Sequence, residues 1–317
     1  MTFKHLFILD TFEKLHIDDD TSLYLMEQLM KKGDEVYSCT EYDIALSSKK
    51  KICHAYSYNK KIIKDVIAHS NSEPKNDYDL HGFNFIHIRK DPPFDMSYVT
   101  LLLLLETVQG PLIINNPTKL LEHNEKMVIF NFQGLITDTY VSSTIQEIKT
   151  QIKDLGGKGI LKPLFSCRGQ GVVLLDETQK DYEEKILTGT AHQKERVMIQ
   201  RFLPAIINGE TRVLMIEDKP LVALKKVPKK GSIYTNLHSG AQLLPHTLTA
   251  TEKKLCEHIG GFCKKEGLFF TALDIIDDKL SEINMTSPSL LRQADNLYRY
   301  NFSLEWIDKL YNKYSML

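Results

Sequence analysis

The chain has 317 residues, of which 42% are hydrophobic and 26% charged, and its formal net charge is −1. This length is enough for two or three domains with a large buried core, and the composition is that of an ordinary globular protein. The near-neutral charge provides no global basic surface, so we expect no nucleic-acid partner. The strongest apolar run, Leu101 to Leu105, is far too short to span a bilayer, so we expect no membrane partner.

The cysteines and the N-terminal residues indicate a reducing, cytoplasmic location. The five cysteines are odd in number and scattered, and no Cys-x-x-Cys pair occurs. This pattern argues against a disulfide framework and against a zinc site. Residues 1–10 lack the apolar core of a signal peptide.

The first part of the chain predicts a β-α-β arrangement. Residues 5–9 form a buried-strand run, and residues 21–32 carry apolar side chains at helical spacing. Asp20 is a plausible N-cap and Gly33 a plausible C-terminal stop for this helix. A second strand follows at 35–39. This order favours a parallel sheet.

The next segment ends at an expected domain boundary near residue 119. Asn116 followed by Pro117 predicts a helix start there, with the proline at the first helical position. The remaining elements are a loop at 70–79, strands at 83–88 and 112–115, and a helix at 98–107.

The second part of the chain predicts strands interrupted by capped helices. Ser143 with Gln146 predicts a capping box, and Thr249 with Glu252 predicts another for a helix ending at Glu266. Residues 227–242 are expected to form a mobile loop. Strands are expected at 137–141, 159–163, 171–176, 197–202, 210–216 and 220–226, with a last helix at 303–314.

The segment 273–284 reads as two apolar strands joined by an acidic turn. Glu282 and Asn284 are two residues apart, so on a strand they share one face. A three-residue turn would set Asp274 opposite Glu282, whereas a two-residue turn would place Asp274 on the other face. Side-chain oxygens gathered in this way suit Mg²⁺. An ordinary hairpin with a solvated polar face remains the alternative.

Residues 162–173 read as a strand, a short glycine-containing loop and a second strand. The glycines Gly169 and Gly171 let backbone N–H groups approach an anion, and Lys162 ends the first strand with a charge suited to phosphate. A β-hairpin with a loose turn explains the same pattern. The apolar strand around Gln200 suits an adenine ring or is simply a core strand, and Arg212 suits either a phosphate or a carboxylate.

Taken in order, these pieces resemble the ATP-grasp ligases and, within them, the bacterial-type glutathione synthetases. The matching segments are Arg89-Lys90-Asp91-Pro92-Pro93-Phe94-Asp95, Asn124-Glu125-Lys126, Leu161 to Leu164, Gln200 to Ile206, Gly209 to Val213, Leu273 to Ile276 and Ser281 to Pro288.

The resemblance implies an α/β chain (α+β overall), with an N-terminal parallel-sheet domain at 1–119 and an ATP-grasp domain at 120–317. The loop at about 227–242 would be its lid. ATP would phosphorylate a substrate carboxylate with the help of Mg²⁺, and an amine would then attack the acylphosphate. The implied substrates are the small molecules γ-glutamylcysteine and glycine, and the family also implies a homo-oligomer.

The resemblance also implies roles for individual residues. Lys162 and Arg212 would act in catalysis. Nucleotide would contact Lys126, Lys162, Gly169, Gly171, Gln200, Arg201, Phe202, Leu203, Asn208 and Arg212. The metal would be held by Asp274, Glu282 and Asn284, and the substrates by Arg89, Lys226, Asn236, Thr286 and Ser287.

Two segments depart from the glutathione synthetase pattern. The loop at 165–171 replaces an Asp-Gly-Met-Gly-Gly type loop, and Tyr234 stands where the lid of that family has an arginine. A related ligase that adds another amino acid, or that modifies a peptide or protein tail, therefore stays open as an alternative. A non-catalytic nucleotide-binding protein is a third hypothesis.

Overall fold

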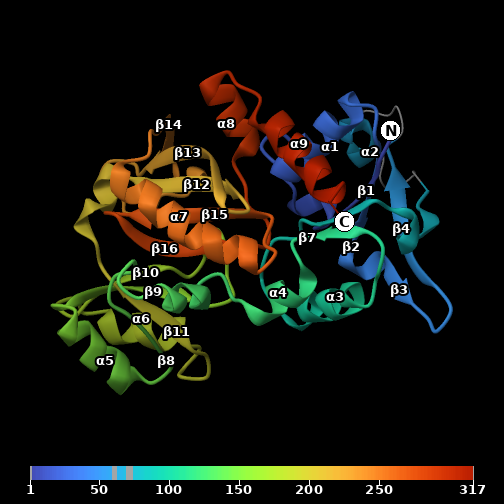
Figure 1. Ribbon diagram of the computed structural model, residues 1–317. Helices are drawn as coiled ribbons and strands as arrows, with labels where there is room; N and C mark the ends of the chain where they lie inside the picture. The colour runs from blue at the N-terminus through green and yellow to red at the C-terminus, as the bar shows by residue number, and fades with distance from the viewer. Residues whose placement is uncertain (1, 59–62, 69–73, 317) are drawn as a thin grey trace.

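The computed structural model describes residues 2–58, 63–68 and 74–316, which form three β-sheets with helices packed on them (Figure 1). The first sheet has seven strands, in the order β3-β4-β2-β1-β6-β7 with β5 on β4. Its strands are β1 (Lys4–Leu9), β2 (Glu35–Thr40), β3 (Ile44–Leu46), β4 (Lys51–Ser57), β5 (Asn76–Asp79), β6 (Phe85–Ile88) and β7 (Leu112–Ile114).

The centre of this sheet confirms the predicted parallel arrangement. Strand β1 pairs in parallel with β2 and β6, and β6 pairs in parallel with β7. An antiparallel extension through β4 was not expected. The loop predicted at 70–79 is wrong over Asn76–Asp79, because these residues pair with β4 as β5. Residues 70–73 lie outside the described residues.

The predicted caps of two N-terminal helices are confirmed. The Asp20 carboxylate accepts hydrogen bonds from the backbone N–H groups of Ser22 and Leu23, at 2.7 and 2.9 Å. The Asn116 side chain accepts one from the N–H of Lys119 at 3.3 Å. The helices of this part are α1 (Thr21–Lys31), α2 (Ile63–Ala68), α3 (Met96–Glu106) and α4 (Pro117–Glu122).

The second sheet is antiparallel, in the order β10-β9-β11-β8, and helices α5 and α6 cover one of its faces. Its elements are β8 (Thr139–Ser142), α5 (Ile145–Asp154), β9 (Lys158–Pro163), β10 (Val173–Asp176), α6 (Tyr182–Gly189) and β11 (Val197–Arg201). The capping box predicted from Ser143 and Gln146 is wrong. Thr144 is the N-cap of α5 without a side-chain cap bond, and Ser142 hydrogen-bonds Glu147 instead.

The third sheet is also antiparallel, in the order β14-β13-β12-β15-β16. Its strands are β12 (Glu210–Ile216), β13 (Lys219–Val227), β14 (Gln242–Pro245), β15 (Phe270–Ile276) and β16 (Lys279–Asn284). Helix α7 (Ala250–Lys265) packs on one face through Leu255 and Ile259. The capping box predicted from Thr249 and Glu252 is confirmed.

The C-terminal helices tie the third sheet to the first. Helices α8 (Leu291–Tyr298) and α9 (Phe302–Tyr314) follow the third sheet and return to lie near α1 (Figure 1). Trp306 on α9 shares one apolar core with Phe7 of β1 and Phe270 of β15. Among the described residues, no helix has the length and apolar character needed to cross a membrane.

A buried histidine pair lies inside the first sheet. The Nδ1 atom of His5 is 3.1 Å from the Nε2 atom of His87, and the Nε2 atom of His5 is 3.5 Å from the Asp34 carboxylate. Burial lowers the pKa of both imidazoles, and for His5 this effect outweighs the opposing effect of Asp34. Burial therefore favours the uncharged form of both rings.

We expect this pair to make the protein less stable in acid. An unfolded histidine has a pKa of about 6.5, so the unfolded chain takes up protons first as the pH falls. The free energy of unfolding should therefore decrease between about pH 7 and pH 5. Urea titrations across this range measure it. A His5→Gln/His87→Gln variant should show a flatter dependence, whereas His258→Gln, at an exposed position, should keep the wild-type slope.

Candidate active site

A cleft of about 450 Å³ lies where residues from all three parts of the fold converge. Such concave sites with a few convergent polar groups are the usual place for ligands. The predicted residues that line it are Arg89, Lys126, Lys162, Gly169, Gln200, Arg201, Phe202, Leu203, Arg212, Lys226, Asn236, Asp274, Glu282, Asn284, Thr286 and Ser287.

Strand β12 changes character along one of its faces. Alternate residues share a face, and on this face Leu214 and Ile216 belong to the apolar core that contains Trp306. Glu210 and Arg212 continue the same face but line the cleft. The strand thus contributes apolar side chains to the core at one end and charged side chains to the cleft at the other.

The charged end forms a row across three strands. Arg212 on β12 lies opposite Asp274 on β15, and Asp274 lies opposite Glu282 on β16. The Nε and Nη2 atoms of Arg212 contact the two Asp274 oxygens at 2.8 and 2.5 Å, which is a bidentate pair. Burial alone would raise the pKa of Asp274, but Arg212 and then Lys226 hold it well below its usual range.

A second ion pair lies one step along the same face. The Nζ atom of Lys226 is 2.7 Å from Glu210 and 3.4 Å from Asp274. Both Lys226 and Glu210 are buried. Burial raises the pKa of Glu210, and the neighbouring Asp274 charge adds to the effect. Removing one partner of such a buried pair typically costs about 3–5 kcal/mol, so these charges depend on each other.

The hairpin places Asp274 opposite Glu282, but not through a three-residue turn. The turn has two residues, Asp277 and Asp278, both with positive φ (51° and 57°). The register shifts after Asp274, so Ser281 is an extra residue in β16. This β-bulge supplies the change in parity that a longer turn would have supplied. The expected shared face is therefore present, while the expected turn length is wrong.

Lys126 links Glu282 on this face to the loop after β9, in agreement with the predicted orientation of the face. The Nζ atom of Lys162 donates to the Ser281 hydroxyl at 2.8 Å. The Nζ atom of Lys126 is 3.5 Å from Glu282 and donates to the Ser166 carbonyl at 2.6 Å. Burial lowers the pKa of Lys162, although the Glu282 carboxylate opposes that shift. The two lysines thus face the carboxylates across the cleft.

The end of β11 forms the opposite wall. Gln200 is buried, and its Nε2 atom donates to Thr139 at 3.2 Å. The Nη2 atom of Arg201 forms an ion pair with Asp138 at 2.6 Å. The guanidinium therefore does not point toward the lysines and carboxylates of the cleft. Two predicted residues lie outside the lining. Asn208 is exposed, and Gly171 lies against Pro163, where a Cβ atom would come within 2.7 Å of the ring.

Arg89 and Thr286 are held rigidly on the N-terminal side of the cleft. The Nε atom of Arg89 donates to Ser22 at 3.0 Å, and its Nη2 atom donates to the Pro288 carbonyl at 2.8 Å. Glu125 accepts from the N–H and the hydroxyl of Thr286, at 2.9 and 2.8 Å. Both groups therefore depend on neighbours far away in the sequence.

Our assignment of site residues missed Glu210 and Glu125. Both are buried and line the cleft. Glu210 could have been found from parity, because it lies two residues before Arg212 and shares its face. Glu125 sits beside Lys126, but no sequence signal reveals that it would hold the backbone of Met285 and Thr286.

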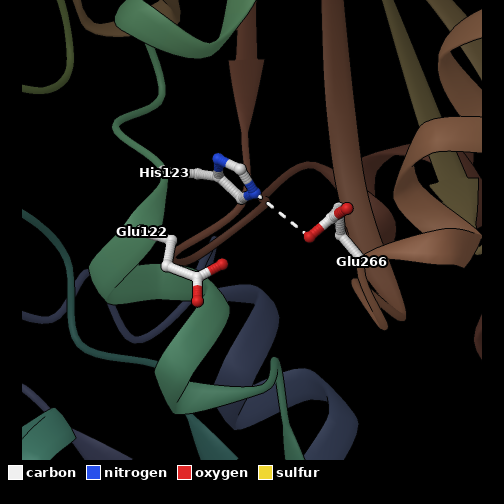
Figure 2. Close-up of side chains that lie close together, drawn as sticks. All are labelled: Glu122, His123 and Glu266. Carbon is white, nitrogen blue, oxygen red and sulfur yellow. Dashed lines mark hydrogen bonds and ion pairs between the residues drawn. The ribbon is translucent and has the colours of Figure 1, made fainter.

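A second group of possible metal ligands lies outside the cleft. Glu122 and His123 at the end of α4 face Glu266 beyond α7 (Figure 2). His123 is 3.4 Å from Glu266, and the Lys119 ammonium is 2.6 and 3.0 Å from the two carboxylates. The hydrogen bond from Lys119 is the main cause of the lowered pKa of Glu266. Because a lysine already balances these charges, the group acts as an ion-pair contact between α4 and α7.

Solved structures identify the class of the fold. The chain resembles the crystal structure of D-cycloserine synthetase DcsG with a TM-score of 0.65 and 12% identity, covering 95% of this chain and 98% of the other. It also resembles a D-alanine–D-alanine ligase from Bacillus anthracis with a TM-score of 0.56 and 14% identity, covering 100% and 98%. The fold is that of the ATP-grasp ligases.

Sequence comparison narrows the class to a family. Residues 3–120 match the profile described as the prokaryotic glutathione synthetase N-terminal domain, and residues 125–299 match that of its ATP-grasp domain. A glutathione synthetase of Prochlorococcus marinus subsp. pastoris is 32% identical over 97% of this chain and 98% of its own length. One from Coxiella burnetii is 31% identical over 97% and 96%.

The chain belongs to the prokaryotic glutathione synthetase family. It is therefore a ligase that forms carbon–nitrogen bonds and uses ATP. The resemblance inferred from the sequence motifs is confirmed.

The two-residue turn between β15 and β16 provides a stability test. Asp277 and Asp278 both occupy the left-handed region, where Asn-Gly is the preferred pair. We expect Asp277→Asn/Asp278→Gly to raise the free energy of unfolding by up to about 1 kcal/mol, as measured by urea denaturation, because glycine adopts a positive φ without a steric cost. Asp277→Pro should lower it, because proline cannot adopt a positive φ. Equal stability of the two variants would contradict the turn assignment.

Proposed function

We propose that the chain is a glutathione synthetase, which joins the cysteinyl carboxylate of γ-glutamylcysteine to the amine of glycine. The observation that carries this proposal is the row of Arg212, Asp274 and Glu282 facing Lys126 and Lys162. The names of the relatives support the choice of substrates.

The residues that line the cleft fit a nucleoside triphosphate. Lys126, Lys162, Arg212 and Lys226 place four cationic side chains around one cavity. Lys162 is half-buried at the cleft wall, and this partial burial lowers the pKa of its ammonium group. The buried Gln200 lies on an apolar strand end that suits a planar base.

We infer that Asp274, Glu282 and Asn284 hold Mg²⁺. Their oxygens are the hard ligands that Mg²⁺ prefers. Glu282 is the most accessible of the carboxylates in the row, because its side chain is 19% exposed and its ion pair with Lys126 is 3.5 Å long. Asp274 is engaged by Arg212, but a carboxylate offers about four lone-pair sites and can serve both partners.

ATP with Mg²⁺ would supply the phosphoryl group and neutralise charge on its oxygens. In the first step a substrate carboxylate oxygen attacks the γ-phosphorus, the bond to the β-phosphate oxygen breaks, and ADP leaves. In the second, the uncharged amine attacks the acyl carbon, inorganic phosphate leaves, and the amine loses a proton. No side chain needs to be a nucleophile, so the chain contributes positioning and electrostatic stabilisation.

Each part of the chain has a place in this scheme. Arg212 and Lys162 stabilise negative charge on the transferring group, and Arg89 binds a carboxylate of the donor. Thr286 and Ser287, next to the metal ligands, lie on the side where the acceptor amine would bind. We expect a homo-oligomer in the cytoplasm, with small molecules rather than nucleic acid or membrane as partners.

The proposal predicts a specific reaction. With ATP and Mg²⁺, the purified protein should form γ-glutamylcysteinylglycine and release one phosphate for each amide bond. Coupled phosphate release and mass spectrometry of the product measure this. A panel of other amino acids tests the alternative suggested by Tyr234, which lines the cleft in place of a lid arginine. Turnover only with a non-glycine acceptor, or only with a peptide or protein tail, would exclude glutathione synthesis while keeping the ligase chemistry.

Glu282→Gln should abolish turnover and leave the fold intact. The amide keeps the shape of the side chain but removes the charge that attracts the metal. We expect a loss of at least about 100-fold in kcat. Calorimetry with ADP should show that Mg²⁺ no longer strengthens nucleotide binding. Glu257→Gln, on the exposed face of α7, is the control and should match wild type. Full activity of Glu282→Gln would show that the metal assignment is incorrect.

A further inference from the structure

Arg168 occupies an unusual position in the loop between β9 and β10. Its φ is +55°, in the left-handed region that glycine normally occupies, and Gly169 and Gly171 beside it also have positive φ. The loop is closed internally, since the Gln170 N–H donates to the Cys167 carbonyl at 3.0 Å. A non-glycine residue in such a conformation has an energetic cost and persists where the surrounding structure holds it.

The Arg168 side chain makes that contact with the N-terminal part of the chain. Its Nη2 atom forms an ion pair with Asp91, and the N–H of Asp91 donates to the Asp10 carboxylate at 2.8 Å. Burial alone would lower the pKa of Arg168, but Asp91 outweighs burial and raises it. Asp91 belongs to the segment 89–95, which also carries Arg89.

Two further contacts join the same loop to the same segment. The Phe94 N–H donates to the Phe165 carbonyl at 3.2 Å, and the Cys167 thiol lies 3.4 Å from the Pro92 carbonyl. Neither involves a full charge. The Arg168–Asp91 pair is therefore the ionic part of a three-point contact between the glycine loop and the segment that holds Arg89.

The backbone of Arg168 holds the lid. The Asn236 side chain donates to the Arg168 carbonyl at 2.6 Å, and the Thr235 hydroxyl contacts Glu210 at 2.5 Å. The lid residues that line the cleft are 233–239, which contain neither lysine nor arginine. Lys229 and Lys230 are exposed and lie outside the lining. The lid is thus held through the neutral side chains of Thr235 and Asn236, and the Asn236 hydrogen bond depends on the conformation at Arg168.

We propose that Arg168 is a positioning residue that couples closure of the lid to the donor side of the cleft. Its guanidinium fixes the glycine loop to Asp91, and its carbonyl in turn holds Asn236 of the lid. Seating of a donor against Arg89 and closure of the lid over the nucleotide then depend on one residue. This inference rests on the proposed function, because it names the residue that links the donor and nucleotide sides of that same site.

A charge-swap cycle tests the coupling. Arg168→Glu should lower kcat/KM for γ-glutamylcysteine by roughly 10- to 100-fold and leave KM for ATP within about twofold, because positioning rather than nucleotide binding is lost. An open lid admits water, so phosphate released per amide formed should rise above one. Arg168→Glu/Asp91→Arg should restore most of kcat/KM and bring phosphate released per amide back toward one. Arg168→Lys should restore part of each. Arg196→Gln, at an exposed arginine outside the cleft, is the matched control.

Two kinetic results would overturn the proposal. One is an Arg168→Glu variant with wild-type kcat/KM and wild-type coupling of phosphate to amide. The other is a double variant as impaired as Arg168→Glu, since a direct contact between Arg168 and substrate would not be restored by reversing the pair.

Tryptic cleavage after Lys229 and Lys230 reports on the lid without any substrate. We expect Arg168→Glu to be cleaved several-fold faster than wild type there, and the charge-swapped pair to return to the wild-type rate, because cleavage follows local opening. If wild type makes no γ-glutamylcysteinylglycine but the cleavage rates follow this pattern, the proposed substrates are wrong and the coupling stands. If wild type makes the product and cleavage is unaffected by Arg168→Glu, the coupling is wrong and the proposed function stands.

Discussion

The buried bidentate pair between Arg212 and Asp274 is the interaction on which the rest of the cleft depends. Asp274 is buried and the Arg212 side chain is only 14% exposed, and neither charge could be kept there alone, because an isolated buried ion costs several kcal/mol. The pair is weak as a source of net stability, since desolvation offsets much of its attraction. Its consequence is geometric. It requires β12 and β15 to keep one register, and that register also sets Glu282 opposite Asp274.

One face of the third sheet borders both the apolar core and the cleft, and the Arg212–Asp274 pair lies where the face enters the cleft. Leu214 on β12 packs with Trp306, whereas Arg212, two residues away, faces the cavity. The apolar end anchors the strand in the core shared with α9, so the charged end is presented on a rigid support. Catalysis by electrostatic positioning requires groups that do not reorganise during the reaction. A strand anchored in this way satisfies that requirement better than a loop.

Much of this architecture could be predicted from local sequence, because the signals are local. The caps at Asp20, Asn116 and Thr249 are side-chain to backbone bonds within three residues, and all are present. Helix α8 begins after Leu290 at φ 85° without a side-chain cap, so it carries no such signal and was missed. The capping box at Ser143 failed because Ser142 reached Glu147 instead. Which of two adjacent serines is used depends on the path of β8, which sequence spacing does not encode.

The hairpin shows where such reasoning stops being reliable. Parity is a global property of a strand pair, and one residue can be inserted in the turn or in a strand with the same effect on the face. The sequence identified the acidic residues and the need for one additional residue that changes the parity of the pairing, but not where that residue is inserted. Placing that residue at Ser281 rather than in the turn has a chemical consequence, because it brings the serine hydroxyl to the Lys162 ammonium. The bulge thus aligns Asp274 with Glu282 and connects their sheet to the lysine of the neighbouring sheet, so one hydrogen bond joins the two walls of the cleft.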